Sequence, residues 1–155
     1  MNKRLIIGIV LSCLGTFSHA QVPAFESFAK DRGVTYGYVS RGILSHSDSI
    51  DFSSLGISPG LEGIIKKLDA LQIIHSNGLR PSRRTEKAVR RIIQDEKYAC
   101  VMQLDEKDRE VTIYSGSRGD AAVLIMCTRD GPDYSVIVFS GSFTLDEVLA
   151  LIKRK

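Results

Sequence analysis

Residues 135–152 read SVIVFSGSFTLDEVLALI, and this segment decides the fold that we expect for the chain. Its first part, residues 136–139, is apolar at every position, which is typical of a strand buried on both faces. In its second part, Thr144 and Glu147 have the spacing of a capping box at the start of a helix. The segment therefore predicts a central strand followed by a capped helix that docks on a sheet.

Four short runs with strand-forming composition make up the C-terminal half of the chain. They are residues 98–104, 111–115, 122–129 and 134–140. Polar turns at residues 105–109, 116–120 and 130–133 separate them. Because short turns join antiparallel neighbours, we predict an α+β fold with a mainly antiparallel sheet, a C-terminal four-strand meander and helices packed on it. The last two strands, apolar on both faces, are expected at its centre.

The N-terminal half supplies further elements. Its composition predicts a short helix over 23–31, a strand over 34–40, a loop or partly helical segment over 45–60, and a strand over 71–75. One further helical face is indicated by the spacing of Leu61, Ile64, Ile65 and Leu68. A longer helix is predicted to start at Pro81, and its inward face consists of Val89, Ile92 and Ile93.

The first twenty residues have the pattern of a secretory signal peptide. Lys3 and Arg4 precede an apolar run over 5–14, and small residues lead to a cleavage junction between Ala20 and Gln21. The run is too short for a permanent transmembrane helix, which needs about 20 apolar residues. We therefore expect residues 1–20 to be removed, residues 21–155 to form one α+β domain, and the protein to be exported to the periplasm or the extracellular space.

Cys13 supports an alternative reading of the same segment. The residues before it, Val10-Leu11-Ser12, loosely resemble a lipoprotein box, in which the cysteine receives acyl chains. A lipid at Cys13 would tether the protein to a membrane, whereas cleavage after Ala20 would release it.

The charge balance bears on the class of partner. The chain has 21 basic and 18 acidic residues, a net charge of +3. Loss of Lys3 and Arg4 lowers this to 19 − 18 = +1 in the expected mature domain. So small a net charge argues against bulk binding of nucleic acid.

Positive charge is nevertheless concentrated on the outer face of the helix predicted from Pro81. Its candidate binding residues are Arg83, Arg84, Lys87, Arg90 and Arg91. Such a face can contact an anionic envelope component or an acidic surface of another protein. A solvated helix face, which any soluble amphipathic helix needs, is the alternative.

The sequence shows few candidates for catalysis or metal binding. No Cys or His residues have zinc spacing, and no serine lies in a nucleophile-elbow motif, so we expect no cofactor, no metal and no catalytic residues. His46, Asp48 and Asp51 are the one weak candidate for a divalent cation site, and His75 is expected as a hydrogen-bonded residue at the edge of the core.

Two cysteines, Cys100 and Cys127, follow the signal segment. In a simple meander the strand between them separates their Cα atoms by about 9–10 Å, beyond disulfide reach. We expect two small buried thiols, with a disulfide as the alternative under another strand order.

Several segments together resemble a known family. These are VTYGYVSR at residues 34–41, LQIIHS at 71–76, VTIY at 111–114, and the stretch from Ser135 to Glu147. They resemble the secreted and lipoprotein-like family called domain of unknown function 4252, found mainly in Bacteroidota. The resemblance implies an envelope location and a small α+β fold, and offers no active site.

The expected function is thus a non-enzymatic binding module in the cell envelope that uses its basic helix. Two alternatives stay open: a hydrolase whose site is assembled from distant residues, and a structural domain that self-associates through its sheet.

Overall fold

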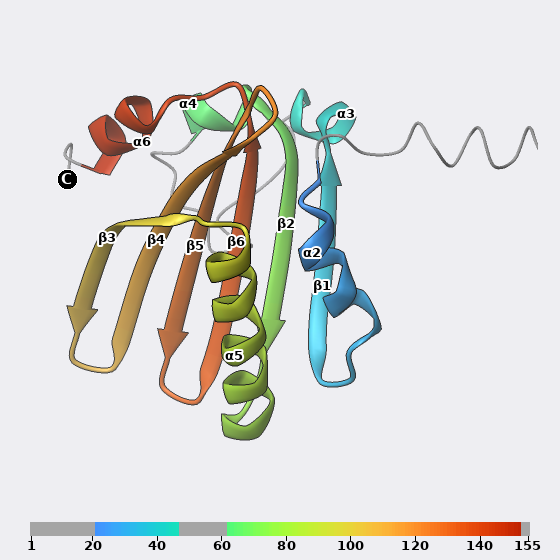
Figure 1. The fold of residues 1–155 in the computed structure, drawn as a ribbon, viewed down its shortest axis with the longest axis vertical. Coiled ribbons are helices and arrows are strands. Elements are labelled where there is room, and N and C mark those ends of the chain that lie inside the picture. The colour runs from blue at the N-terminus through green and yellow to red at the C-terminus, as the bar shows by residue number, and fades with distance from the viewer. Residues whose placement is uncertain (1–20, 47–61, 153–155) are drawn as a thin grey trace, which may run out of the picture.

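The computed structural model describes residues 21–46 and 62–152. Six strands form one antiparallel sheet in the order β1-β2-β6-β5-β4-β3 (Figure 1). They are β1 (Val34–Ser40), β2 (Leu68–Ser76), β3 (Ala99–Glu106), β4 (Arg109–Arg118), β5 (Ala121–Asp130) and β6 (Asp133–Gly141). The predicted signal segment, Cys13 within it, and most of the predicted loop over 45–60 lie outside the described residues.

Helices accompany the sheet on both faces. They are α2 (Pro23–Glu26), the 3₁₀ helix η1 (Ser27–Lys30), α3 (Arg41–Leu44), α4 (Glu62–Ile65), α5 (Leu79–Asp95) and α6 (Leu145–Ile152). The α+β prediction is confirmed, and so is the C-terminal meander, because β3, β4, β5 and β6 are consecutive neighbours.

The hairpin turns are shorter than the sequence predicted. The strands continue until two residues remain, at Lys107-Asp108, Gly119-Asp120 and Gly131-Pro132. Gly119 and Gly131 have φ angles of 59° and 55° at the first turn position, a conformation that glycine adopts without a steric penalty. The assignment of residues 116–118 to a turn was wrong, since all three belong to β4.

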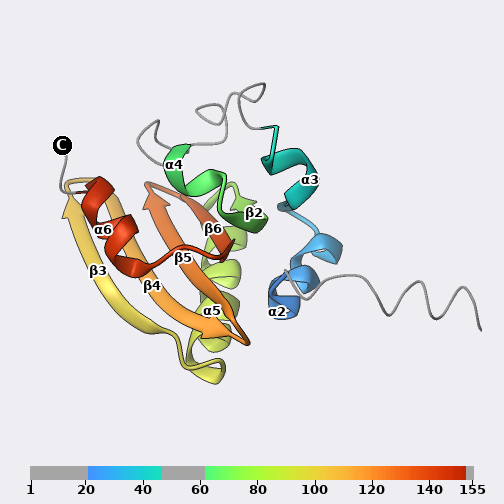
Figure 2. The ribbon, with the colours of Figure 1, turned by 90° about the horizontal axis from the view of Figure 1, so that it is seen from above.

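The sheet has a separate apolar core on each face. Side chains of β5 alternate between them, so that Ile125 faces the first core and Leu124 the second. The first core contains residues of α2, η1 and α5, and the second contains residues of α3, α4 and α6 (Figure 2). This double cover explains why the last two strands are apolar at successive positions, and it confirms their central place.

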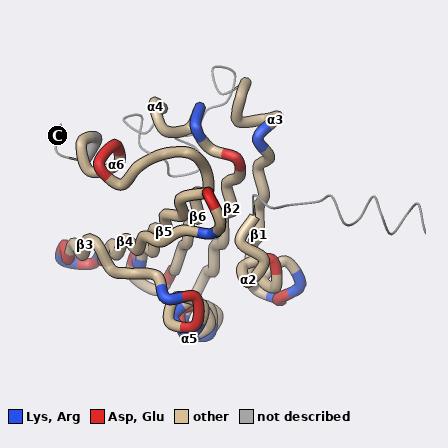
Figure 3. Tube along the Cα trace, turned by 45° about the horizontal axis from the view of Figure 1, so that its top comes forward, with Lys and Arg blue, Asp and Glu red and all other residues tan. Residues whose placement is uncertain are grey.

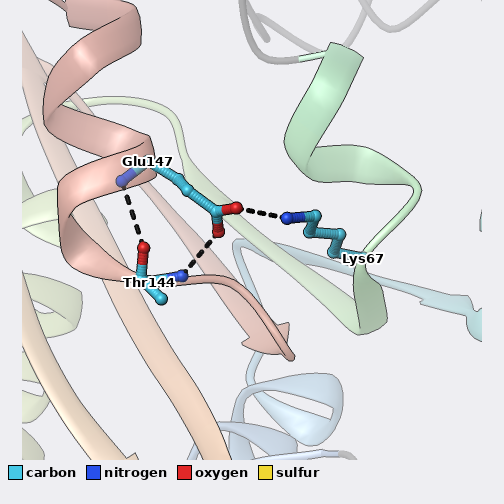
Figure 4. Close-up of polar contacts among 3 residues, drawn as sticks. All are labelled: Lys67, Thr144 and Glu147. Atoms are coloured by element: carbon cyan, nitrogen blue, oxygen red, sulfur yellow. Dashed lines mark hydrogen bonds and ion pairs between the residues drawn. The ribbon is translucent and has the colours of Figure 1, made fainter.

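The capping box predicted at the last helix is present. The Thr144 amide donates to Glu147 Oε2 over 2.8 Å, and the Glu147 amide donates to Thr144 Oγ1 over 3.2 Å (Figure 4). Glu147 also forms an ion pair with Lys67, between α4 and β2. Phe143 and Val148, on either side of the box, are buried in the second core. Local sequence therefore starts α6, and one ion pair connects its first turn to Lys67, the residue directly before β2.

Two predicted boundaries needed correction. The helix expected to include Leu68 ends at Ile65, because Leu68 is buried and pairs with Gly141 at the start of β2. Leu68 thus lies at helical spacing from Leu61, Ile64 and Ile65 although it belongs to the sheet. The basic helix α5 begins at Leu79 rather than at Pro81, and Pro81 occupies its first turn, where a missing amide proton costs nothing.

Candidate functional site

The helix α5 presents the basic face that the sequence predicted. Val89 and Ile93 are buried in the first core, and Ile92 is partly buried beside them. The five predicted candidates, Arg83, Arg84, Lys87, Arg90 and Arg91, are all exposed. Figure 3 shows basic and acidic residues on α5 against a largely uncharged sheet.

Arg84 has a structural partner and differs from the other candidates. Its Nη2 lies 2.9 Å from Asp31 Oδ1 and donates to the carbonyl of Arg32 over 2.8 Å. These contacts connect α5 to the turn between η1 and β1. Arg84 is therefore engaged in holding the fold together.

Glu86 joins two arginines from different elements. Arg90, one turn further along α5, lies 3.1 Å from Glu86 Oε1, and Arg129 of β5 pairs with Glu86 Oε2. The side chain of Glu86 is 16% exposed. One carboxylate between two guanidinium groups leaves a net positive charge at this point and holds both side chains in place.

A groove of about 410 Å³ lies at this cluster. We call it the basic groove, and its lining residues are Arg83, Glu86, Lys87, Arg90, Arg91, Gln94 and Arg129. Among the described residues, Arg83, Lys87 and Arg91 have no ion-pair partner. The groove thus combines three unpaired cations with two arginines that share Glu86, an arrangement suited to an anion.

Arg129 was missed by the sequence analysis. It lies two residues after Cys127 on β5, so alternation places both on the face that α5 covers. The alternation of side chains along the strand could have predicted which face of the sheet Arg129 occupies. Its position beside Glu86 depends on how α5 crosses the sheet, which no local pattern specifies.

The two cysteines are free thiols. Cys127 is buried, and burial raises the pKa of its thiol to about 11, so it is neutral and a poor nucleophile at physiological pH. The prediction of a buried Cys100 was wrong, because β3 is an edge strand and this thiol is exposed. The strand β4 separates the two residues, as expected, and they do not pair.

His75 lies between two polar side chains on the other face of the sheet. Its Nδ1 is 2.6 Å from Ser135 Oγ, and its Nε2 is 2.7 Å from Asn77 Oδ1. If Nε2 carries the proton and donates to Asn77, Nδ1 is left to accept from the Ser135 hydroxyl. The prediction of a hydrogen-bonded histidine at the core edge is confirmed, and the arrangement also has the order nucleophile, base and orienting group.

The weak cation candidate does not assemble among the described residues. His46 is exposed and its Nδ1 lies 2.9 Å from the carbonyl of Gly42, whereas Asp48 and Asp51 lie outside the described residues. No group of three metal-ligating side chains occurs within 21–46 and 62–152. In the same ranges, no helix is both long and apolar enough to cross a bilayer.

Comparison with known families gives a match over most of the chain. The profile of a domain of unknown function, DUF4252, matches residues 27–151. The chain belongs to the DUF4252 family. The matched part of this DUF4252 protein runs from η1 into α6, and it includes the whole sheet and the basic groove. No curated protein and no solved structure matches the chain.

Proposed function

We propose that this DUF4252 protein is an exported, non-enzymatic binding domain whose basic groove holds an anionic group of the cell envelope. The observation that carries the proposal is the meeting of two elements at Glu86, where Arg129 of β5 and Arg90 of α5 share one carboxylate. With Arg90 and Arg129 included, the groove is lined by five basic residues, and Glu86 is its one acidic residue.

The chemistry of the groove favours phosphate or carboxylate groups. An arginine binds either group through two parallel N–H donors, and a second arginine held nearby reduces the entropy lost on binding. Glu86 keeps Arg90 and Arg129 close to each other despite their like charge. An arriving anion therefore meets donors that are already oriented.

The proposed cleavage between Ala20 and Gln21 is compatible with the contacts that the domain makes with Gln21 and Val22. Arg118 Nη1 donates to the carbonyl of Gln21 over 2.7 Å, and Val22 is fully buried. Cleavage between Ala20 and Gln21 would leave both of these contacts in the mature domain. Mass spectrometry of the protein from fractionated cells would distinguish a soluble chain that starts at Gln21 from a membrane form acylated at Cys13.

The test of the groove uses vesicles of phosphatidylethanolamine with and without added phosphatidylglycerol. The variant R83Q/K87Q/R91Q removes its three unpaired cations, and K30Q/K107Q/R109Q removes three exposed cations elsewhere. In a co-sedimentation assay, we expect the first variant to lower the affinity for the anionic vesicles at least tenfold. The second variant should change this affinity little. Equal effects of both variants would show that binding depends only on net charge, and they would refute the groove as the binding site.

The contacts of His75 favour one second candidate, a hydrolase that uses Ser135. In that case Ser135 would react covalently with a fluorophosphonate probe, and S135A would abolish the labelling. A serine beside a histidine in directly opposite positions of β2 and β6 is also an ordinary polar pair of a sheet surface. Asn77 supplies an amide where the common triad has a carboxylate, so we rank this candidate second.

A further inference from the structure

A cleft lies beside the basic groove, between α5 and the β3–β4 hairpin, and has a volume of about 740 Å³. Arg90 lines both the cleft and the groove, and it also lines a small hollow of about 40 Å³. Figure 1 shows α5 in front of the middle of the sheet, with β3 and β4 to one side of it. The groove, the hollow and the cleft thus meet at Arg90, and we call the three together the depression.

Uncharged hydrogen-bonding side chains line part of the cleft, beside Arg90, Lys97 and Glu110. Gln103 of β3 and Thr112 of β4 are cross-strand partners in its floor, and Gln94 of α5 forms part of its wall. None of these three side chains has a hydrogen-bond partner among the described residues. Amide and hydroxyl groups that the protein leaves unpaired are available to a ligand with many hydroxyl groups.

An aromatic ring lies next to these polar groups. Tyr114 follows Thr112 on the same face of β4 and packs partly against the first core. Burial raises the pKa of its phenol, so it is a neutral donor at physiological pH. An aromatic ring beside unpaired amides and hydroxyls suits a ligand with both apolar and polar surface, such as a sugar ring.

Basic residues outnumber acidic residues in the lining of the depression. Its lining contains six basic residues, Arg83, Lys87, Arg90, Arg91, Lys97 and Arg129. Only two acidic residues accompany them: Glu86, which pairs with Arg90 and Arg129, and Glu110, which lies opposite Arg129 on the neighbouring strand. The excess of basic residues favours an anionic group in the depression, and Glu110 lines the small hollow together with Arg90 and Arg129.

We infer that the depression binds a sugar that carries an anionic group, with its phosphate or carboxylate at Arg90 and Arg129 and its hydroxyl groups at Gln94, Gln103 and Thr112. The inference rests on the proposed function and names its ligand class. A flat lipid surface against α5 would contact Arg83, Lys87 and Arg91 without reaching the floor of the cleft. The unpaired side chains on that floor are what favour a discrete ligand.

Calorimetric titration of the mature domain with four probes tests the inference. The probes are glucose 6-phosphate, glucuronate, inorganic phosphate and glucose. We expect at least one of the two anionic sugars to bind at least tenfold more tightly than inorganic phosphate and glucose. The sugar that binds more tightly tells whether the preferred group is a phosphate or a carboxylate.

Variants separate the cleft from the groove. T112V removes a hydroxyl from the floor, and T128V removes one from β5 on the opposite face of the sheet. We expect T112V to lower affinity for the anionic sugar to that of inorganic phosphate, and T128V to leave it unchanged. R90Q should weaken inorganic phosphate and the anionic sugar alike.

The outcomes distinguish the two proposals. Anionic vesicles or inorganic phosphate that bind through the groove, together with no preference for either sugar, would refute the sugar site and leave the groove standing. If no anion binds and R83Q/K87Q/R91Q has no effect, the proposed function itself fails. Equal effects of T112V and T128V on affinity would also contradict the cleft as the sugar site, since Thr112 lines it and Thr128 does not.

Discussion

Gln72 holds Val22 by both of its backbone groups. The Val22 amide donates to Gln72 Oε1 over 3.1 Å, and Gln72 Nε2 donates to the Val22 carbonyl over 3.2 Å. The same Nε2 lies 3.0 Å from the hydroxyl of Tyr36. Val22 belongs to no strand, and the buried Gln72 side chain of β2 satisfies its backbone groups as a neighbouring strand would. These hydrogen bonds hold the chain against the sheet just before α2 begins.

Substitution of Gln72 by leucine is expected to destabilise the domain by about 2–4 kcal/mol, because it leaves both backbone groups of buried Val22 without a partner. Urea denaturation measures the change. Q103L replaces an exposed glutamine in a strand and should change stability by no more than about 0.5 kcal/mol. A similar loss in both variants would show that Val22 does not depend on Gln72.

The capping box at α6 predicts a smaller effect. T144A removes the oxygen that accepts the Glu147 amide, and the expected cost is about 1 kcal/mol. T144S keeps this oxygen and should retain most of the stability. Thermal unfolding of both variants checks the order, and an equal loss in T144S would assign the effect to the methyl group instead.

Stability should depend on pH through Glu147. The hydrogen bond from Lys67, helped by the Thr144 amide, holds the pKa of Glu147 below its usual value. A carboxyl with a lowered folded-state pKa contributes stability above its unfolded pKa, about 4.3, and loses it as pH falls through the folded value.

The variant E147Q isolates this contribution. Wild type is expected to exceed E147Q in stability at neutral pH, and the difference should shrink as pH falls below about 4. E106Q, at an exposed hairpin end, is the control and should show no such trend. Urea denaturation across pH makes the comparison, and a difference that persists in acid would contradict the ion pair with Lys67.

Gly141 is expected to tolerate no side chain. A Cβ at this position would lie 2.3 Å from the carbonyl oxygen of Lys67 and 2.8 Å from Leu68 Cα, both backbone atoms. G141A should therefore cost about 2–4 kcal/mol or prevent folding. G63A, in α4 with no atom within 4 Å of the added Cβ, should be neutral or stabilise by up to about 1 kcal/mol. Circular dichroism and urea denaturation report both effects.

The two thiols should react at very different rates. Iodoacetamide alkylates thiolates, so exposed Cys100 is expected to react in the folded protein while buried Cys127 reacts only after unfolding. Mass spectrometry of the peptides that contain each residue separates them from Cys13. Rapid modification of Cys127 under native conditions would show that the first core opens easily.

The features that sequence predicted are those with local causes. The capping box of Thr144 and Glu147 lies within one turn, and the meander is specified by short turns between neighbouring strands. Leu68 was misassigned because one apolar residue at helical spacing cannot tell a helix from the strand that follows it. The exposure of Cys100 also had no local signal, since it depends on which strand forms the edge.

The basic groove was half predictable for the same reason. Arg83, Lys87, Arg90 and Arg91 follow from the periodicity of one helix. Arg129 lies almost forty positions further along the chain, and only the packing of α5 on the sheet brings it to Glu86. The floor of the cleft likewise depends on where α5 lies over the sheet.

The place of β2 in the sheet sets the order in which the chain can fold. Strands β3, β4 and β5 each pair with the strand that follows in sequence. In contrast, β2 pairs with β6, and Gln72 lies opposite Val138. Contacts between near neighbours form quickly, and those that close a long loop form slowly. A chain that emerges amino end first must therefore keep β1 and β2 without their central partner until β6 appears. The last strand and its capped helix complete the sheet, and any truncation that removes them leaves the β1–β2 pair with no strand to join it to the meander.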